Sequence, residues 1–166
     1  MNMRETAWRV SAMELNASTL EIRATEEKMP SYVVTPLGAK VNRVLISGVL
    51  TEIDNIGTDE EPMWRGKIVD IGGNFYINVG RYQTDAVAEM TVLREPCFVA
   101  AVGRVRTYPG DNGRMCVSVR PEHIVEVDEK TRNEWLLETA KSTWGRLKDM
   151  KKALSDPSMK VDGLIR

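Results

Sequence analysis

Apolar and polar residues alternate through residues 64–80, which predicts two short strands joined by a turn. In the segment Phe75–Val79 every second residue is apolar, and a tyrosine and an asparagine lie between them. The segment Trp64–Ile68 has the same period, with cations at the intervening positions. Gly72-Gly73 lies between the segments, and glycine accepts the positive φ that a tight hairpin turn needs. The pattern therefore predicts a hairpin with one buried and one polar face.

A longer β pattern runs over Val41–Ile53 and carries apolar residues on both faces. Strict alternation puts Ile53 on the opposite face to Leu50. A strand that is apolar on both faces is covered on both sides or bends between two sheets. Gly48, near its middle, predicts a bulge or a sharp bend.

Two further strands are predicted in the second half of the chain. The segment Cys97–Arg106 is one, and Gly103 within it again predicts a bend. The segment Met115–Arg120 is the other. Pro121 is expected to end it, because proline cannot donate to a strand ladder, and Ile124–Val127 would extend it.

Three segments carry apolar residues at the helical spacing of three to four. Ala7–Leu15 predicts a short helix, and Tyr82–Leu93 predicts another with Thr84 as its N-cap. Residues 131–154 predict one long helix, in which Thr131 and Glu134 form a capping box.

The order of three strands, a helix and two strands is that of the five-stranded OB barrel, so we expect a mainly β fold. Two brief strands, Thr19–Arg23 and Tyr32–Val34, would belong to a flanking N-terminal segment. Such barrels hold an oligonucleotide beside their first and last loops, here residues 54–62 and 107–114. The predicted division of the chain is an N-terminal extension packing on the barrel (1–38), an OB-fold domain (39–128), a subunit-association helix (129–155) and a flexible tail (156–166).

The composition fits one soluble domain with appendages, since 42% of the 166 residues are hydrophobic. A formal net charge of −1 argues against a strongly basic nucleic-acid binder, although a local basic face can still bind. Cys97 and Cys116 form no CxxC motif, so we expect reduced thiols in a cytoplasmic protein. No signal-peptide pattern and no apolar run near the roughly 18 residues of a membrane span are present, so no membrane contact is expected.

Motifs for catalysis and for metal or cofactor binding are missing from the sequence. His123 is the only histidine, and nothing near it marks a nucleophile. No Cys/His group has zinc spacing, and no glycine-rich phosphate loop is present. We therefore expect a non-enzymatic protein with no cofactor, no metal and no small-molecule substrate. A small enzyme that uses His123 is the alternative.

The outward positions of the predicted barrel carry cations and aromatic rings, which hold phosphates and stack on bases. Phe75 and Trp64 fall on the apolar face and are expected in the core, while acidic residues in the loop 54–62 oppose a phosphate backbone. Weak intrinsic affinity is therefore expected. The predicted nucleic-acid-binding residues are Arg65, Lys67, Tyr76, Asn78, Arg81, Arg104, Arg106, Tyr108, Arg114 and Arg120.

The apolar stripe of the long C-terminal helix includes a tryptophan that is costly to expose. Such a helix folds back on its own barrel or packs against helices of partner subunits. Its length is more than a cap on so small a barrel needs, which favours association. The predicted partner-binding residues are Leu136, Ala140, Trp144, Leu147, Met150 and Leu154.

Five segments that together span most of residues 5–145 form a specific combination. They are Ala7–Val10, Tyr32–Val44, Trp64–Asp70, Tyr82–Gln83 and Arg120–Glu122. In this combination the chain resembles the archaeal replication protein A-associated proteins, which are encoded with the archaeal single-strand-binding protein. It is also similar to the middle subunit of heterotrimeric replication protein A, whose trailing helix joins a three-helix bundle. The stretch Met159–Arg166 departs from this pattern.

The resemblance implies an OB fold and a hetero-oligomeric partnership with replication protein A subunits on single-stranded DNA in replication and repair. It brings no catalytic or metal residues. The rival binding function is an RNA- or tRNA-associated OB module in translation, and the sequence leaves the choice between DNA and RNA open.

Overall fold

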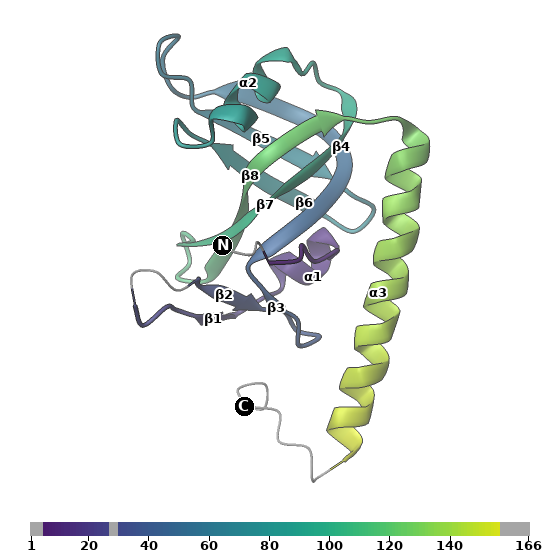
Figure 1. The fold of residues 1–166 in the computed structure, drawn as a ribbon. Helices are drawn as coiled ribbons and strands as arrows, with labels where there is room; N and C mark the ends of the chain where they lie inside the picture. Colours follow the sequence, from purple (N-terminus) through teal and green to yellow (C-terminus); the bar gives the residue numbers. More distant parts are fainter. Residues whose placement is uncertain (1–4, 27–29, 157–166) are drawn as a thin grey trace.

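The computed structural model describes residues 5–26 and 30–156, and Figure 1 shows a mainly β protein flanked by helices. All of the predicted tail after residue 156 lies outside the described residues, and the division into domains stays a prediction. The elements, in chain order, are α1 (Ala12–Asn16), β1 (Leu20–Ile22), β2 (Tyr32–Val34), β3 (Lys40–Val41), β4 (Arg43–Asn55), β5 (Trp64–Val69), β6 (Asn74–Val79), α2 (Thr84–Val92), β7 (Cys97–Pro109), β8 (Met115–Glu126) and α3 (Glu129–Ser155).

Five strands close into a barrel in the hydrogen-bonded order β4-β5-β6-β8-β7, and β7 pairs with β4 to complete it. Neighbouring strands are antiparallel except β6 and β8, which are parallel. Three strands, α2 and two strands thus follow one another as in an OB barrel. The predicted fold class, including the flanking N-terminal segment and the long C-terminal helix, is confirmed.

Side chains alternate between the barrel interior and solvent, as the hairpin pattern predicts. In Phe75–Val79 the three apolar side chains are buried and Tyr76 is exposed. The two short helices lie at opposite ends of the barrel (Figure 1). Met90 of α2 and Leu15 of α1 both belong to the buried core cluster, so each helix closes one end.

A bulge in β4 changes which side chains face the core. The register against β5 shifts between Leu50 and Glu52, so Thr51 is an extra residue in the ladder. Ile53, which strict alternation puts opposite to Leu50, therefore packs against the same core, and Glu52 turns outward. The predicted bulge thus lies further along the strand than Gly48.

Gly48 lies beside the point where β4 has two neighbours at once. The next residue, Val49, pairs with Val69 of β5 and with Phe98 of β7. A Cβ atom on Gly48 would lie 2.4 Å from the carbonyl oxygen of Val69, so no side chain fits there. The glycine is required for close approach of two backbones.

The strand β8 runs unbroken through Pro121, where the sequence predicted its end. The β7–β8 register shifts between Val102 and Gly103, which leaves Glu122 as the extra residue of a bulge. Proline is tolerated at a bulge because the ladder is locally interrupted. A Cβ atom on Gly103 would lie 2.2 Å from the carbonyl oxygen of Arg120, so the predicted irregularity at this glycine is confirmed.

The turn between β5 and β6 comprises Asp70–Gly73 and is longer than the predicted two-glycine turn. Neither Gly72 nor Gly73 has a positive φ, so the conformational reason given for them is wrong. The Asp70 carboxylate accepts hydrogen bonds from the backbone N–H of Gly72 and from that of Ala12, each at 2.8 Å. This carboxylate therefore shapes the turn and fastens α1 to it.

Two helices begin at residues other than those predicted. The N-cap of α2 is Gln83 rather than Thr84. The N-cap of α3 is Asp128, whose carboxylate accepts a hydrogen bond from the Thr131 N–H at 2.8 Å. The hydrogen bond lowers the pKa of Asp128, as expected for a carboxylate at a helix N-terminus.

The N-terminal segment pairs with the barrel before α1 begins. Trp8 donates its N–H to the carbonyl of Arg43 at 2.8 Å and accepts from Leu45 N–H at 2.9 Å. This extended pairing delays the helix predicted over Ala7–Leu15, and α1 starts only at Ala12, after Ser11 caps it.

The predicted brief strands β1 and β2 are present and form an antiparallel sheet with β3. The Thr107 hydroxyl of β7 donates to Glu21 of β1 at 2.8 Å, which ties this sheet to the barrel hairpin.

The long helix α3 packs on the barrel through a tryptophan that the predicted stripe did not include. Trp135 is 6% exposed, and its ring contacts Phe75 edge to face with centroids 6.4 Å apart. Its indole N–H donates to the Leu45 carbonyl at 2.7 Å. Among the described residues no helix is long and apolar enough to cross a membrane.

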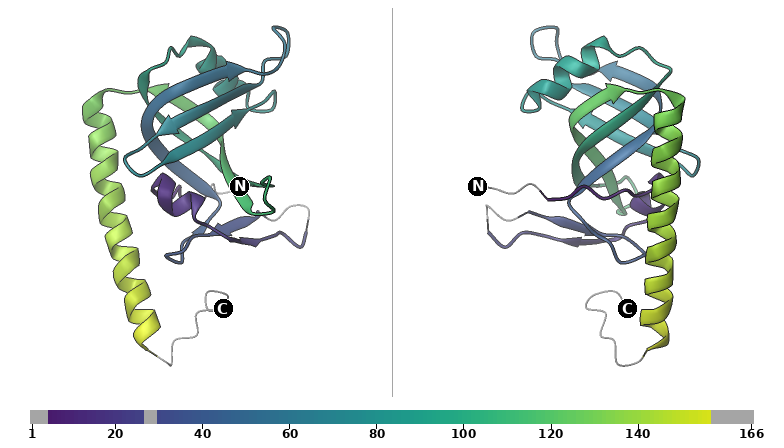
Figure 2. Two further views of the ribbon diagram at one scale, coloured as in Figure 1. Left: turned by 180° about the vertical axis from the view of Figure 1, so that it is seen from behind. Right: turned by 45° about the vertical axis from the view of Figure 1, so that its right-hand side comes forward.

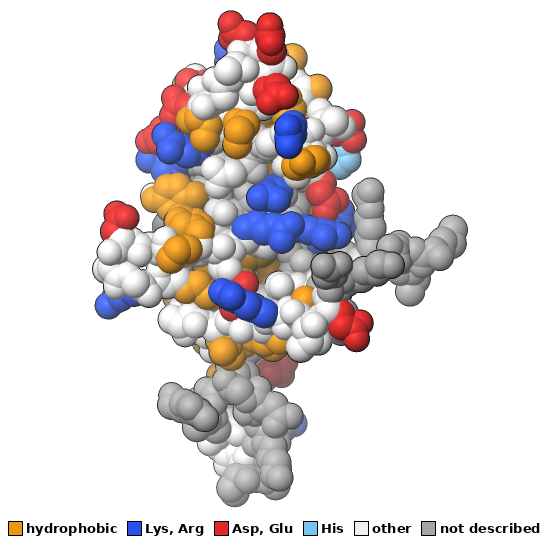
Figure 3. All heavy atoms as spheres, turned by 90° about the vertical axis from the view of Figure 1, so that its left-hand side faces the viewer, with side chains coloured by type: hydrophobic (Ala, Val, Ile, Leu, Met, Phe, Trp, Pro, Cys, Tyr) orange, Lys and Arg blue, Asp and Glu red, His pale blue; other side chains and the backbone are white. Residues whose placement is uncertain are grey.

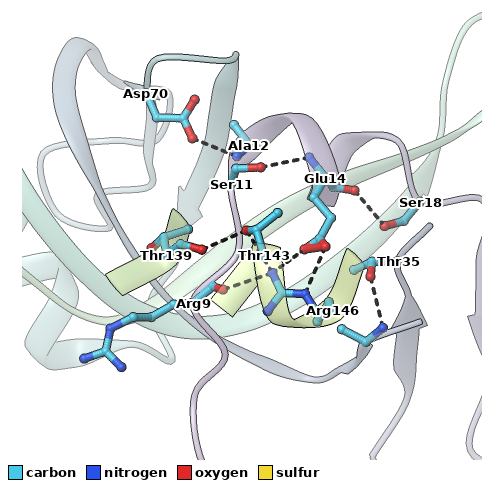
Figure 4. A network of polar contacts seen from close by, with 11 residues as sticks. Arg9, Ser11, Ala12, Glu14, Ser18, Thr35, Asp70, Thr139, Thr143 and Arg146 are labelled. Atoms are coloured by element: carbon cyan, nitrogen blue, oxygen red, sulfur yellow. Dashed lines mark hydrogen bonds and ion pairs between the residues drawn. The ribbon is translucent and has the colours of Figure 1, made fainter. Parts of the chain in front are cut away.

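A buried ion pair fastens the middle of α3 to α1 (Figure 4). The Arg146 guanidinium donates two hydrogen bonds to the Glu14 carboxylate, at 3.0 and 2.8 Å. The Arg146 side chain is 11% exposed and that of Glu14 is 4% exposed. Arg146 also donates to the Arg9 carbonyl and the Thr143 hydroxyl, so its donors are well satisfied.

We expect Arg146→Met to lower the free energy of unfolding by about 3–5 kcal/mol, because it leaves the buried Glu14 carboxylate without a counter-charge. Denaturant unfolding of the full chain measures this loss. The double variant Glu14→Leu/Arg146→Met should recover much of it, since no charge is then buried. The matched control is Lys141→Met, which removes an exposed i,i+3 pair with Glu138 and should change stability by less than about 1 kcal/mol. Equal effects of the two single substitutions would contradict the structural role of the buried pair.

Candidate nucleic-acid interface

Two rows of outward side chains cross β4, β5 and β6. Each row places a carboxylate on β4, a cation on β5 and a polar ring or amide on β6, because the strands are in register at these positions. The rows are Glu52, Lys67 and Tyr76, and Asp54, Arg65 and Asn78.

These rows line a groove of about 550 Å³, called here the first groove. Tyr108, from the end of β7, completes its lining. Tyr76 and Tyr108 are each 44% exposed, so their rings are accessible to a ligand. Burial raises the pKa of Tyr108, and the neighbouring Cys116 and Tyr76 raise it further. The structure thus brings together five predicted residues, namely Arg65, Lys67, Tyr76, Asn78 and Tyr108.

A second groove of about 440 Å³ adjoins the first at Asn78, which lines both. The predicted cations Arg81 and Arg120 line it. Tyr82 also lines it and is 80% exposed, with the Arg81 guanidinium 4.9 Å from its ring centroid. Trp64, expected in the core, packs partly against the core and partly lines this groove.

Three arginines form a cluster on β7 and β8 beside the grooves. Arg104 lies opposite Arg120, and Arg106 is two residues further along the same face of β7. Burial and the charges of Arg120 and Arg104 lower the pKa of Arg106. None of the three forms an ion pair with a carboxylate in the described part of the chain, so this cluster is a site of uncompensated positive charge.

Positive charge is therefore local although the net charge of the chain is near zero. Figure 3 shows Lys and Arg side chains in a band across the middle of one face, with hydrophobic groups beside it and acidic groups at the top. Arg104, Arg106 and Arg114 line neither groove. Arg114 belongs to the turn 110–114, which is shorter than the predicted last loop because β7 continues to Pro109.

Glu52 is a groove carboxylate that the sequence did not assign. Asp54 was expected in the loop 54–62 as an acidic residue that opposes phosphate, and it lies instead within β4, which continues to Asn55. Lys67 Nζ lies 2.5 Å from Glu52 Oε1, and this hydrogen bond raises the pKa of Lys67. The outward direction of Glu52 depends on the bulge at Thr51, for which the sequence carries no signal.

A second exposed surface lies on α3. Three of its residues, Ala140, Trp144 and Leu147, line a pocket of about 250 Å³. Trp135 and Ser11 line the same pocket. Figure 2 shows α3 running along the barrel and extending beyond it. Leu136 and Met150 of the predicted stripe are half-buried, whereas Leu137 is 57% exposed and Trp144 is 62% exposed. Six exposed residues of α3 follow one another at alternating steps of three and four. We call this set the α3 seam, and it consists of Leu137, Ala140, Trp144, Leu147, Lys151 and Leu154.

His123 lies on β8 and pairs with α2 on the surface. Its Nδ1 lies 2.9 Å from Glu89 Oε1, and its Nε2 lies 4.0 Å from Asp85. The hydrogen bond with Glu89 is the main cause of a raised pKa of His123. No group of three or more possible metal ligands occurs among the described residues. These contacts give the histidine a structural role between β8 and α2.

Comparison with known proteins shows which solved structures resemble this chain in fold. No known family profile matches the chain, and no curated protein matches it in sequence. A chain of the solved structure titled "Structure and Conformational Change of a Replication Protein A Heterotrimer Bound to ssDNA" aligns with TM-score 0.59 and 15% identity. The alignment covers 86% of this chain and 98% of that chain. The chain therefore shares its fold with a chain of that structure.

Two other solved structures match over less of the chain. The yeast Stn1 and Ten1 structure aligns with TM-score 0.49 and 12% identity, over 65% of this chain and 55% of that one. An OBody bound to hen egg-white lysozyme aligns with TM-score 0.44 and 18% identity, over 52% of this chain and 94% of that one.

We expect the single histidine to titrate above its ordinary pKa of about 6.5, because Glu89 stabilises the imidazolium. The pair stabilises the fold fully below the unfolded pKa, and this contribution is lost as the pH rises through the higher folded pKa. NMR titration of the His123 ring protons measures the value. Glu89→Gln should return it toward 6.5, and an unchanged pKa in this variant would show that Glu89 is not the cause.

Proposed function

We propose that the protein is a non-enzymatic subunit of a replication protein A-type complex, which binds single-stranded DNA with its barrel and joins partner subunits through α3. The similarity to a chain of the heterotrimer bound to single-stranded DNA carries this proposal. The barrel strands span about half of the chain, whereas the alignment covers 86% of the chain. The alignment therefore includes residues that precede the barrel and residues that follow it in the sequence. The likeness thus extends beyond a bare OB barrel.

The outer face of the barrel supports DNA binding. Single-stranded nucleic acid is held by cations that follow the phosphates and by rings that stack on the bases. The grooves provide exposed rings at Tyr76, Tyr108 and Tyr82, and the unpaired arginine cluster lies beside them.

The α3 seam supports a hetero-oligomer. Apolar residues at alternating steps of three and four form the contact surface of coiled coils and helical bundles. In a parallel pair of identical helices Lys151 would face its own copy, which disfavours a homodimer. Lys141 and Lys148 flank the seam, so the favoured partner helix carries acidic residues beside its own apolar seam.

The resemblance to the archaeal replication protein A-associated proteins makes an archaeal, cytoplasmic role in DNA replication and repair the specific form of this proposal. The RNA- or tRNA-associated module is the competing function. Affinity purification of the tagged full chain from its native cells separates them. Replication protein A subunits are the partners expected here, whereas ribosomal or synthetase partners would refute the proposal.

We expect Tyr76→Ala and Tyr108→Ala each to weaken binding of labelled oligo-dT by about fivefold to 150-fold, since stacking on one ring is worth about 1–3 kcal/mol. Fluorescence anisotropy of the full chain at fixed salt measures the affinity. Tyr76→Phe and Tyr108→Phe keep the rings and should bind nearly as well as the unchanged protein. Equal affinity of the alanine and phenylalanine variants would show that the first groove does not hold bases.

We expect Trp144→Glu and Leu147→Glu to abolish co-purification of the partner subunits, because each puts a charge into the apolar seam. Trp144 and Leu147 are exposed, so the thermal midpoint of the isolated chain should remain within a few degrees of its original value. Ser142→Glu adds the same charge on an exposed position outside the seam and is the control. Truncation is unsuitable, since it would remove Trp135 from the core. Partner binding that survives both seam substitutions would contradict the assignment.

A further inference from the structure

Cations and carboxylates lie side by side in the first groove, and a further set of cations lies across the sheet from them. The carboxylates of Glu52 and Asp54 lie on β4, at one side of the groove. The arginines of β8 and β7 lie beyond β6, on the other side of Tyr76, because the strand order is β4-β5-β6-β8-β7. On the β4 side of Tyr76 the cations of β5 are balanced by these carboxylates, because Lys67 is hydrogen-bonded to Glu52 and Arg65 lies opposite Asp54. A ligand seated on Tyr76 therefore meets a nearly neutral flank that carries carboxylates and, on the other side, a cationic flank.

The two carboxylates are available to a ligand. The Glu52 side chain is 59% exposed, and Lys67 holds only its Oε1 atom, so Oε2 has no hydrogen bond with a described residue. Asp54 is exposed and its carboxylate forms neither a hydrogen bond nor an ion pair within the described part of the chain. Lys67 thereby fixes the direction of the Glu52 side chain and leaves its second carboxylate oxygen able to accept a hydrogen bond from a ligand.

This difference in net charge orients a bound single strand. Phosphates are attracted more strongly to the arginines of β8 and β7, which have no carboxylate partner among the described residues, than to cations that already face a carboxylate, so the backbone follows β8 and β7. Bases stacked on Tyr76 and Tyr108 then direct their hydrogen-bonding edges toward β4.

A carboxylate at the base edges distinguishes among the bases. An ionised carboxylate only accepts hydrogen bonds, and it pairs well with an exocyclic amino group such as cytosine N4. Thymine has a carbonyl oxygen at the place of that amino group, and its N3–H donor lies between two carbonyl oxygens, which repel the carboxylate. Adenine and guanine, like cytosine, carry an amino group.

We propose that Glu52 and Asp54 are specificity-determining residues, which make the first groove bind bases with exocyclic amino groups more tightly than thymine. This inference rests on the proposed binding of single-stranded DNA and adds a base preference to it.

The test compares oligo-dC with oligo-dT of about 16 nucleotides, a length that covers one OB fold. Fluorescence anisotropy of the full chain is measured at fixed salt and slightly alkaline pH, where cytosine is neutral. We expect oligo-dC to bind at least about fivefold more tightly than oligo-dT, the lower end of discrimination by a good base contact. Similar affinities for both oligomers would overturn the inference and leave the proposed function intact, whereas no binding of either would overturn both.

The double variant Glu52→Gln/Asp54→Asn tests the residues themselves. Removing two negative charges should strengthen binding of both oligomers, and the ratio between them should fall to about one, because an amide offers a donor as well as an acceptor. Asp59→Asn/Glu60→Gln is the matched control, since it removes two exposed charges from the β4–β5 loop outside the groove lining. The control should keep the preference for oligo-dC. A preference that persists in the groove variant, or that disappears equally in the control, would contradict the assignment.

Discussion

Closure of the barrel by β4 is the constraint on which the other features depend. At Val49 and Leu50 this strand is paired with β5 on one side and β7 on the other, which joins the ends of the sheet. The backbones approach so closely that only glycine fits at position 48. Once the sheet is closed, every side chain lies either inside or outside, and the inside is filled by apolar residues. The proposed binding face is therefore part of the set of outward positions that closure leaves to solvent.

The helix α3 has one buried and one exposed face. Trp135, Thr139 and Arg146 face the barrel and α1, and all are largely buried. The buried pair with Glu14 sets the direction of the helix, because a bidentate contact has a defined geometry. The α3 seam remains exposed, and its middle part borders a pocket that Ser11 and the β5–β6 turn also line. Folding back on the barrel and joining partners, the two possibilities that the sequence left open for this helix, are thus compatible in one structure.

Much of the barrel could be predicted because apolar and polar residues alternate along a strand that is buried on one side, and this alternation is visible even in a short segment. The faces of β5 and β6 follow from it, and so do five groove residues on the sheet. Interruptions of the period could not be predicted. The extra residue at Thr51 reverses the faces of Glu52 and Ile53, and no local signal announces it. Helix caps were placed wrongly at Thr84 and Thr131 because neighbouring residues were also able to occupy the cap position.

Contacts between residues far apart in the chain also could not be predicted from the pattern of apolar and polar residues. Glu14 and Arg146 are 132 positions apart, and each alone reads as an ordinary charged residue on a helix. Together with Asp70, which holds the start of α1, they connect the β5–β6 hairpin to α3. The strands that line the first groove and the α3 seam are thereby held in a fixed relative orientation. A chain of packed polar contacts supports positioning of this kind. Energetic coupling between the two surfaces would in addition require an element with two alternative arrangements, because both ligands can influence each other only through an equilibrium that each of them shifts.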